Sequence, residues 1–181
     1  GPAAIGTKAA RVLAAREVRA TIAALEAAGS AVRYVPVDTR DARALGDVLE
    51  QVRAEVGAIT GLVHAAGVLA DARIEDKTDE QFDMVFGTKA EGLRGLLDAT
   101  AQDPLESVCV FSSVAGRFGN TGQSDYAMAN EVLAHVASGV AALRPDCVVR
   151  SLAWGPWDGG MVGPALREHF RAAGVDLIPL H

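Results

Sequence analysis

The alternation of helical segments with short, continuously apolar segments is the feature that most restricts the fold of this chain. Residues 61–66 (GLVHAA), 107–113 (SVCVFSS) and 147–155 (CVVRSLAWG) are apolar runs of strand length. Between them, residues 79–100 and 126–144 carry apolar side chains at helical spacing. Apolar strands that alternate with helices predict an α/β fold, a Rossmann-like parallel sheet with helices on both faces.

Further elements are expected on either side of this central region. Apolar positions at helical spacing predict helices over 8–28, 39–57 and 163–173, and the alternating segment 31–37 (AVRYVPV) predicts a strand. We find no internal repeat, low-complexity tract or linker. With 181 residues, the chain is predicted to form a single domain.

Composition and charge exclude several classes of protein. The apolar runs are far shorter than the roughly 18 residues of a membrane span, and the N-terminus lacks the pattern of a signal peptide. The net charge of −6, with acids and bases interspersed, argues against a nucleic-acid surface. Cys109 and Cys147 lie in strand-like runs, which indicates buried free thiols in a reducing compartment. We therefore expect a cytoplasmic protein without a membrane or nucleic-acid partner.

Candidate functional residues gather where the predicted strands end. In α/β sheets, ligands bind outside the carboxyl ends of the strands. The residues at these ends are Asp38, then 65–67 (AAG), then Ser112 and Ser113, then 154–157 (WGPW). All four groups are expected on one edge of the sheet.

Four polar residues near this edge suggest acid–base chemistry. Ser113 ends one strand, and Tyr126 opens the next helix, so both side chains can reach one pocket. A tyrosine, with an ordinary pKa of about 10, needs a nearby cation to act as an acid at neutral pH. Lys89, a lysine among apolar neighbours in the preceding helix, can supply it. Asn130 lies one turn after Tyr126 on the same helix face.

Each of these residues also has an ordinary structural interpretation. Serine at a strand end is commonly a turn or cap residue, a tyrosine opening a helix commonly packs, and a lone lysine commonly lies at the surface. Likewise, Asp38 can cap the following helix, and we interpret His64 as a strand histidine with its hydrogen bonds satisfied, not as a catalytic residue. The combination at one edge favours a catalytic site. We expect no metal site.

Four segments in order resemble a known family. They are HAAGV (64–68), FSSVAG (111–116), YAMAN (126–130) and WGPWDGGMV (154–162). Together they resemble the ketoreductase domains of polyketide synthases, in the short-chain dehydrogenase/reductase superfamily. In the wider superfamily the lysine follows the tyrosine by four positions and the asparagine lies in the earlier helix. Here the two are exchanged, as in ketoreductase domains, and the chain is most similar to those of iterative synthases, including the polyunsaturated fatty acid and enediyne types.

The resemblance implies reduction of a β-ketoacyl group by NADPH, with the substrate carried on an acyl carrier protein and other domains of the same synthase as partners. By the same resemblance, Tyr126 would donate a proton to the carbonyl oxygen and Ser113 would hydrogen-bond that oxygen. Lys89 and Asn130 would tune the tyrosine and relay protons.

The resemblance also implies which residues contact the cofactor and the substrate. The cofactor-binding residues would be Asp38, Ala65, Ala66, Gly67, Tyr126, Gly155 and Pro156. Asp71, Phe118 and Met161 would border the substrate and influence the stereochemistry of the alcohol. Asp71 matches the second aspartate of the Leu-Asp-Asp motif of B-type ketoreductases, whereas Ala70 replaces the first. Residues 156–176 would form a lid over the substrate.

One part of a dinucleotide site is missing from this sequence. No G-x-G-x-x-G turn is present to bind a pyrophosphate, and the family's first two strands and last strand have no counterpart. We therefore expect a partial ketoreductase domain over residues 1–181, as a slice of a larger polypeptide or completed by another segment. The alternatives are a non-catalytic ketoreductase-like domain that binds no cofactor on its own and, more remotely, a free-standing reductase of small ketones.

Overall fold

The computed structural model describes residues 2–180 and contains two compact units, with the boundary between Pro36 and Val37. The first unit contains α1 (Pro2–Ala27) and the residues that follow it. The helix predicted over 8–28 is confirmed and begins earlier than expected. After it, Gly29 has a φ of +91°, a left-handed conformation that ends helices and favours glycine.

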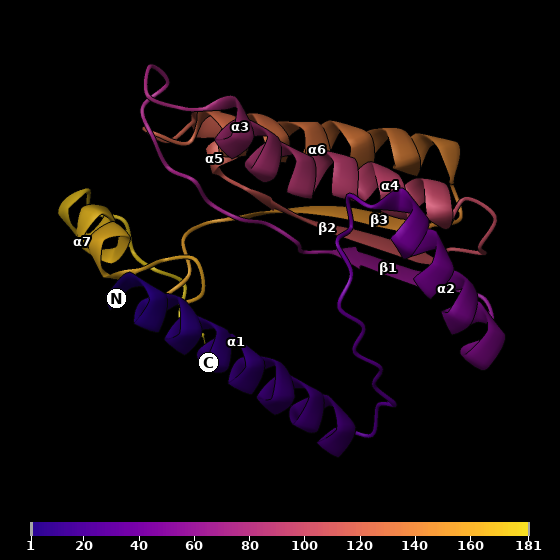
Figure 1. The fold of residues 1–181 in the computed structure, drawn as a ribbon. Helices are drawn as coiled ribbons and strands as arrows, with labels where there is room; N and C mark the ends of the chain where they lie inside the picture. Colours follow the sequence, from indigo (N-terminus) through magenta and orange to yellow (C-terminus); the bar gives the residue numbers. More distant parts are fainter. Residues whose placement is uncertain (1, 181) are drawn as a thin grey trace. The chain divides into compact units, whose positions relative to one another are not determined.

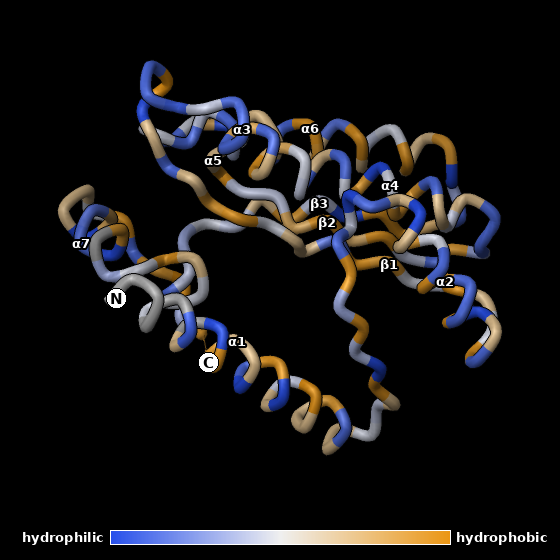
Figure 2. Tube along the Cα trace, in the orientation of Figure 1, coloured by the Kyte–Doolittle hydropathy of each residue, from blue (hydrophilic) through white to orange (hydrophobic). Residues whose placement is uncertain are grey.

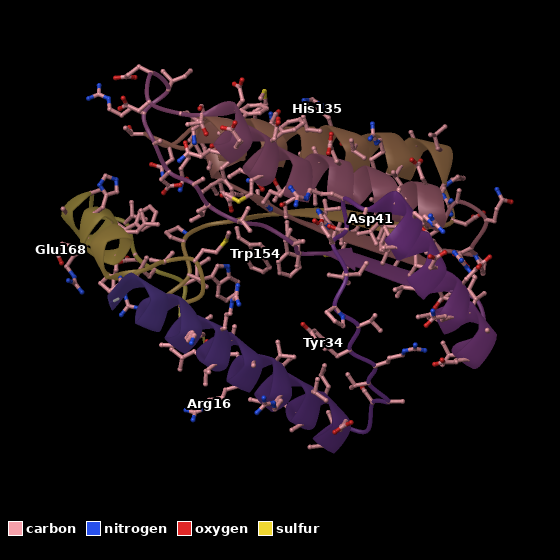
Figure 3. The ribbon with its side chains drawn as sticks, viewed as in Figure 1. Arg16, Tyr34, Asp41, His135, Trp154 and Glu168 are labelled. Carbon is pink, nitrogen blue, oxygen red and sulfur yellow. The ribbon has the colours of Figure 1, made fainter. Side chains whose placement is uncertain are left out.

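Residues 31–37 do not form the predicted strand. Their backbone belongs to no strand, and the side chain of Tyr34, labelled in Figure 3, is 60% exposed. A strand must pair with a neighbour to satisfy its backbone N–H and C=O groups, and no described strand pairs with this segment. The alternating pattern was therefore insufficient without a pairing partner.

The second unit is built on a sheet of three parallel strands in the order β1-β2-β3 (Figure 1). The strands are β1 (Gly61–His64), β2 (Ser107–Ser113) and β3 (Val148–Trp154). The register pairs Ser113 with Trp154, so the carboxyl ends of β2 and β3 lie side by side. These three predicted strands and the α/β class are confirmed, and Figure 2 shows hydrophobic residues along all three strands.

Helices cover one face of this sheet. They are α3 (Asp79–Phe86), η1 (Gly87–Glu91), α4 (Gly92–Ala99) and α6 (Ser124–Leu143). Figure 1 shows α6 beside α3 and α4 above the strands, and α6 contacts both β2 and β3. Leu93, Val108, Val110 and Leu133 are buried between the helices and the sheet. On the opposite face of β1, Val63 is 64% exposed.

The helix predicted over 79–100 is interrupted by a π turn. It begins with a capping box, in which the Thr78 hydroxyl accepts the N–H of Gln81 and the Gln81 side chain accepts the N–H of Thr78. At η1 the hydrogen bonds widen, and the N–H of Gly92 donates to the carbonyl of Gly87. Such turns are rare and frequently lie at functional sites. Apolar spacing does not report a single widened turn, so the sequence did not predict it.

The remaining helices are α2 (Ala42–Val56), α5 (Ala115–Phe118) and α7 (Pro164–Ala172). α2 begins after Asp41, labelled in Figure 3, whose carboxylate accepts the N–H groups of Arg43 and Ala44 at 3.1 and 3.0 Å. α5 was not predicted.

Across residues 2–180, no helix combines the length and apolar character that a membrane span requires. Both cysteines are free thiols; Cys147 is buried and Cys109 is half-buried.

Candidate active site

A cavity of about 380 Å³ opens at the carboxyl ends of the strands. Most of the residues predicted for catalysis, cofactor and substrate lie in its wall. They are Ala65, Gly67, Lys89, Ser113, Tyr126, Gly155, Pro156 and Met161. Trp154 also lines it, at the end of β3 on the side toward α7 (Figure 3). This volume is in the range of small-molecule sites.

Lys89 projects from the π turn into this cavity. Its side chain is 4% exposed, and its Nζ donates a hydrogen bond to the carbonyl of Phe111 at 2.9 Å. The same Nζ lies 5.4 Å from the centre of the Tyr126 ring, within the range of a cation–π contact. Burial lowers the pKa of Lys89 to about 8, because a charged ammonium loses hydration there. The lysine head therefore reaches a polar pocket, as the sequence suggested.

Gly67 leaves room for this lysine. A Cβ at position 67 would lie 3.1 Å from Cε and 3.5 Å from Nζ of Lys89, and 3.6 Å from Cε of Met161. The first of these distances is tighter than ordinary carbon contacts. A glycine at position 67 of the HAAGV segment is thus favoured by the space that Lys89 needs, in addition to the cofactor contact expected from the sequence.

Two serines at the end of β2 have different roles. The Oγ of Ser113 lies at the cavity and accepts the N–H of Ala115 at 3.2 Å, so its own hydroxyl hydrogen can point elsewhere. Ser112 also borders the cavity but is buried, and its hydroxyl donates to the carbonyl of Asn130 at 2.9 Å. Ser112 fastens α6 to β2, a role that the sequence did not distinguish from that of its neighbour.

Asn130 lies behind the tyrosine. Its Nδ2 donates to the carbonyl of Tyr126 at 2.8 Å, and the residue is fully buried. Its Oδ1 is also buried and has no partner among the described residues. A buried amide oxygen without a partner is a position at which an ordered water can bind. Asn130 does not line the cavity itself.

A polar network joins the loop after β1 to the start of α6. The Nε2 of Gln123 donates to Asp71 at 3.0 Å, and Gln123 also lines the cavity. Deeper in the unit, Lys77 and Asp125 form an ion pair at 2.7 Å, with side chains only 5% and 2% exposed. Asp125 also accepts the N–H of Tyr126 at 2.8 Å.

Sequence reasoning did not single out Gln123, Lys77 or Asp125. The only available signal for Asp125 and Gln123 was their closeness to Tyr126 in the chain. Lys77 gave none, since a lysine before a helix is ordinarily solvated.

Asp38 lies away from this cavity. It lines a second one of about 490 Å³, together with residues of α3 and η1 that include Phe86 and Glu91. Arg40 donates to both of its carboxylate oxygens, and this hydrogen bonding lowers the pKa of Asp38 to about 2.

Three of the other expected residues do not line the main cavity. Ala66 is half-buried beside it, Asp71 touches it only through Gln123, and Phe118 is 86% exposed at the end of α5. No group of histidine, cysteine or acidic side chains among the described residues is arranged to bind a metal.

Residues 156–176, the predicted lid, contribute a wall of the cavity. Met161, Val162, Leu166 and Phe170 line it from α7 and the loop before it. Behind this loop, a β-bridge joins Trp157 to Ile178.

Comparison with known proteins identifies the family to which this chain belongs. The model of the family described as "KR domain" matches residues 4–159. The chain is 44% identical over 179 residues to a subunit of the polyunsaturated fatty acid synthase of Thraustochytrium sp., covering 98% of this chain and 6% of that protein. It is 40% identical over 146 residues to the polyketide synthase GfsB of Streptomyces halstedii, covering 80% of this chain and 3% of that protein. The chain thus corresponds to a small part of these relatives.

Solved structures agree with the observed fold. An N-terminal ketoreductase from the macrolactin assembly line superposes with a TM-score of 0.79 at 30% identity, over 91% of this chain and 32% of that one. A short-chain dehydrogenase from Burkholderia cenocepacia, solved in complex with NADP, gives a TM-score of 0.78 at 21% identity, over 91% of this chain and 71% of that one. The second likeness concerns the fold alone.

Proposed function

The chain belongs to the KR domain family of polyketide and polyunsaturated fatty acid synthases, and from this membership we propose that it reduces a β-ketoacyl group to a β-hydroxyacyl group. The observation that carries the proposal is the meeting of Lys89, Ser113 and Tyr126 at one cavity at the strand ends. These three side chains come from three separate elements, so their meeting is not a consequence of sequence proximity.

The roles of the residues follow from their chemistry. Tyr126 donates a proton to the ketone oxygen of the substrate, and the Ser113 hydroxyl hydrogen-bonds that oxygen as negative charge develops on it. The ammonium of Lys89, held by the Phe111 carbonyl, stabilises the phenolate that remains. Asn130 holds a water at its free Oδ1, from which a proton is returned to the tyrosine through the lysine.

We assign NADPH as the hydride donor. When bound, NADPH would supply the hydride for the β-carbon, and the proton from Tyr126 would complete the change of C=O to CH–OH. The cavity is suited to a nicotinamide ring: Phe111 and Trp154 provide flat apolar surface in its wall, and the Nε1 of Trp154 is buried without a partner among the described residues. The dehydrogenase of the same fold that was solved with NADP supports this choice.

The proposed substrate is an acyl chain on an acyl carrier protein, within a multidomain cytoplasmic synthase. Support comes from the relatives, which are synthases of which this chain matches only a small part. Asp71 and Met161 border the acyl chain in this proposal, and residues 156–176 close over it. Asp38, in the second cavity, would contact the adenine end of the cofactor. Ala65 and Ala66 would lie beside the cofactor, and Pro156 would border its nicotinamide end.

The test is ketone reduction by the whole synthase polypeptide that the proposal places around this chain. NADPH consumption is followed at its absorbance with a β-ketoacyl thioester as substrate. Tyr126→Phe should lower kcat by about 10²–10⁴-fold, since it removes only the proton donor. Tyr34→Phe, the same change at the other tyrosine, is the matched control and should leave the rate unchanged, because Tyr34 lies outside the second unit and is exposed. Full activity of Tyr126→Phe would contradict the proposal.

The alternative is a non-catalytic domain with the same fold, which binds no cofactor on its own. NADPH titration distinguishes the two. A whole polypeptide that binds no NADPH would support the non-catalytic alternative, whereas binding that Asp38→Ala weakens would support the enzyme.

A further inference from the structure

His64 is a buried residue to which the proposed mechanism gives no role. It ends β1, is 1% exposed, and its Nε2 lies 2.9 Å from the backbone carbonyl oxygen of Lys89. A carbonyl oxygen only accepts hydrogen bonds, so Nε2 carries the hydrogen and donates it. Burial lowers the pKa of His64, which keeps the ring neutral and fixes this tautomer.

The acceptor of this hydrogen bond lies within the π turn. Lys89 is in η1, where the widened hydrogen bonds displace the backbone from an ordinary helix. The imidazole also packs against the end of this turn: a Cβ at Gly92 would lie 3.4 Å from Cε1 of His64 and 2.7 Å from Oγ1 of Thr39. The turn is therefore held from the sheet side by one hydrogen bond and by a close contact that requires glycine.

The side chain of Lys89 depends on the same turn. Its Nζ must reach the Phe111 carbonyl and the Tyr126 ring at the same time. The position of its Cα is set by the backbone that His64 contacts, because the lysine carbonyl itself is the acceptor. A shift of the turn would move the ammonium away from both partners.

We propose that His64 is a positioning residue for Lys89, whose Nε2–H holds the π turn and so keeps the lysine ammonium against Phe111 and Tyr126. The expected effect of His64 on kcat rests on the proposed ketone reduction. The effect of His64 on the structure of the π turn is independent of that function and is measured separately.

Three variants test this role. His64→Leu removes the donor with little change in volume, and His64→Gln retains an N–H at a similar reach. Leu62→Ala is the matched control, since Leu62 lies two residues earlier on the same face of β1 and is also buried in the core. All three are made in the whole polypeptide, and unfolding of each is followed to separate a local change from a general loss of stability.

Hydrogen–deuterium exchange of peptides that cover residues 87–92 is the first readout. His64→Leu should exchange about tenfold faster there, as expected for loss of one buried hydrogen bond, whereas His64→Gln should match the wild type. Leu62→Ala should show no increase confined to these residues. Unchanged protection of residues 87–92 in His64→Leu, or an equal local increase in Leu62→Ala, would overturn the proposal.

Ketone reduction is the second readout. His64→Leu should lower kcat about tenfold with little change in KM, and His64→Gln should restore it. A kcat in His64→Leu equal to that of the wild type would overturn the catalytic part. Full activity of Tyr126→Phe together with the expected hydrogen–deuterium exchange of residues 87–92 would contradict the proposed function. The same result would support the role of His64 in holding the π turn.

Discussion

Lys89 carries its charge in surroundings that oppose it. Its side chain is almost completely buried, and the carbonyl of Phe111 compensates only part of the lost hydration. The lowered pKa is the measurable consequence, and it has a defined effect on stability. Below about pH 8 the lysine is charged in the folded and unfolded chain alike, so burial lowers stability by a constant amount.

Between about pH 8 and the ordinary value of 10.5, the unfolded chain still binds a proton that the folded chain has released. Stability contributed at this site therefore rises with pH over that window. We expect the free energy of unfolding of the wild type to gain about 3 kcal/mol relative to Lys89→Met from pH 7.5 to pH 10.5. Urea unfolding at intervals of pH measures this difference.

The control for this experiment is Lys8→Met, because Lys8 is exposed on α1. Its difference from the wild type, measured over the same range, gives the effect of removing an exposed lysine. A Lys89→Met difference that matches it at every pH would contradict the lowered pKa of Lys89.

Gly67 is the second residue whose replacement should affect the lysine. In Gly67→Ala the new Cβ would press on Cε of Lys89, and the flexible side chain would yield by leaving its position at the Phe111 carbonyl. We expect kcat for ketone reduction to fall about tenfold, equivalent to about 1.4 kcal/mol of transition-state stabilisation. Gly46→Ala in α2 meets nothing within 4 Å and should leave kcat unchanged. Equal kcat values for Gly67→Ala and Gly46→Ala would show that Gly67 has no steric role in positioning Lys89.

At the scale of elements, the loop after β1 is tied to the start of α6 by buried charge. The Lys77 and Asp125 side chains are nearly inaccessible, and Lys77 also donates to the carbonyl of Ala70 at 2.9 Å. Removing one partner leaves the other as an unpaired buried charge. We expect Lys77→Met to lower the free energy of unfolding by about 3–5 kcal/mol.

A double-mutant cycle tests this contribution. Lys77→Met combined with Asp125→Leu should cost less than the sum of the single changes, because the double variant leaves no unpaired charge. Arg73 and Glu75, an ion pair with side chains 74% and 58% exposed, give the comparison, and Arg73→Ala should cost at most about 1 kcal/mol. Additive effects in the buried pair would mean that the two side chains act independently.

Elements differed in how well the sequence predicted them. β2 matched its predicted run from end to end, because serines at both of its ends flank the apolar residues 108–111. All of it pairs with β3, and its first four residues also pair with β1. The segment 31–37 had the alternation of a strand and failed, because pairing depends on a neighbour that a local pattern cannot supply. The π turn escaped prediction because one widened turn leaves the apolar spacing on either side intact.

At the scale of the whole molecule, the sequence predicted the meeting of Lys89, Ser113 and Tyr126, since parallel strands bring their carboxyl ends to one edge. It did not predict the supports of the site. His64, Ser112 and Asp125 act through a backbone carbonyl or N–H of another functional residue, and the identity of a side chain gives no sign of which backbone group it will meet.

The parallel order of the three strands also has a consequence for how the site comes into being. Parallel neighbours cannot be joined by a tight turn, so each pairing closes a long stretch of chain, and such pairings form slowly. The ammonium of Lys89 binds β2, and the ring that it faces belongs to a helix that follows β2 in the chain. The proposed catalytic residues therefore come together only once these distant segments have joined, and recovery of the proposed ketone reduction during refolding should mark that moment.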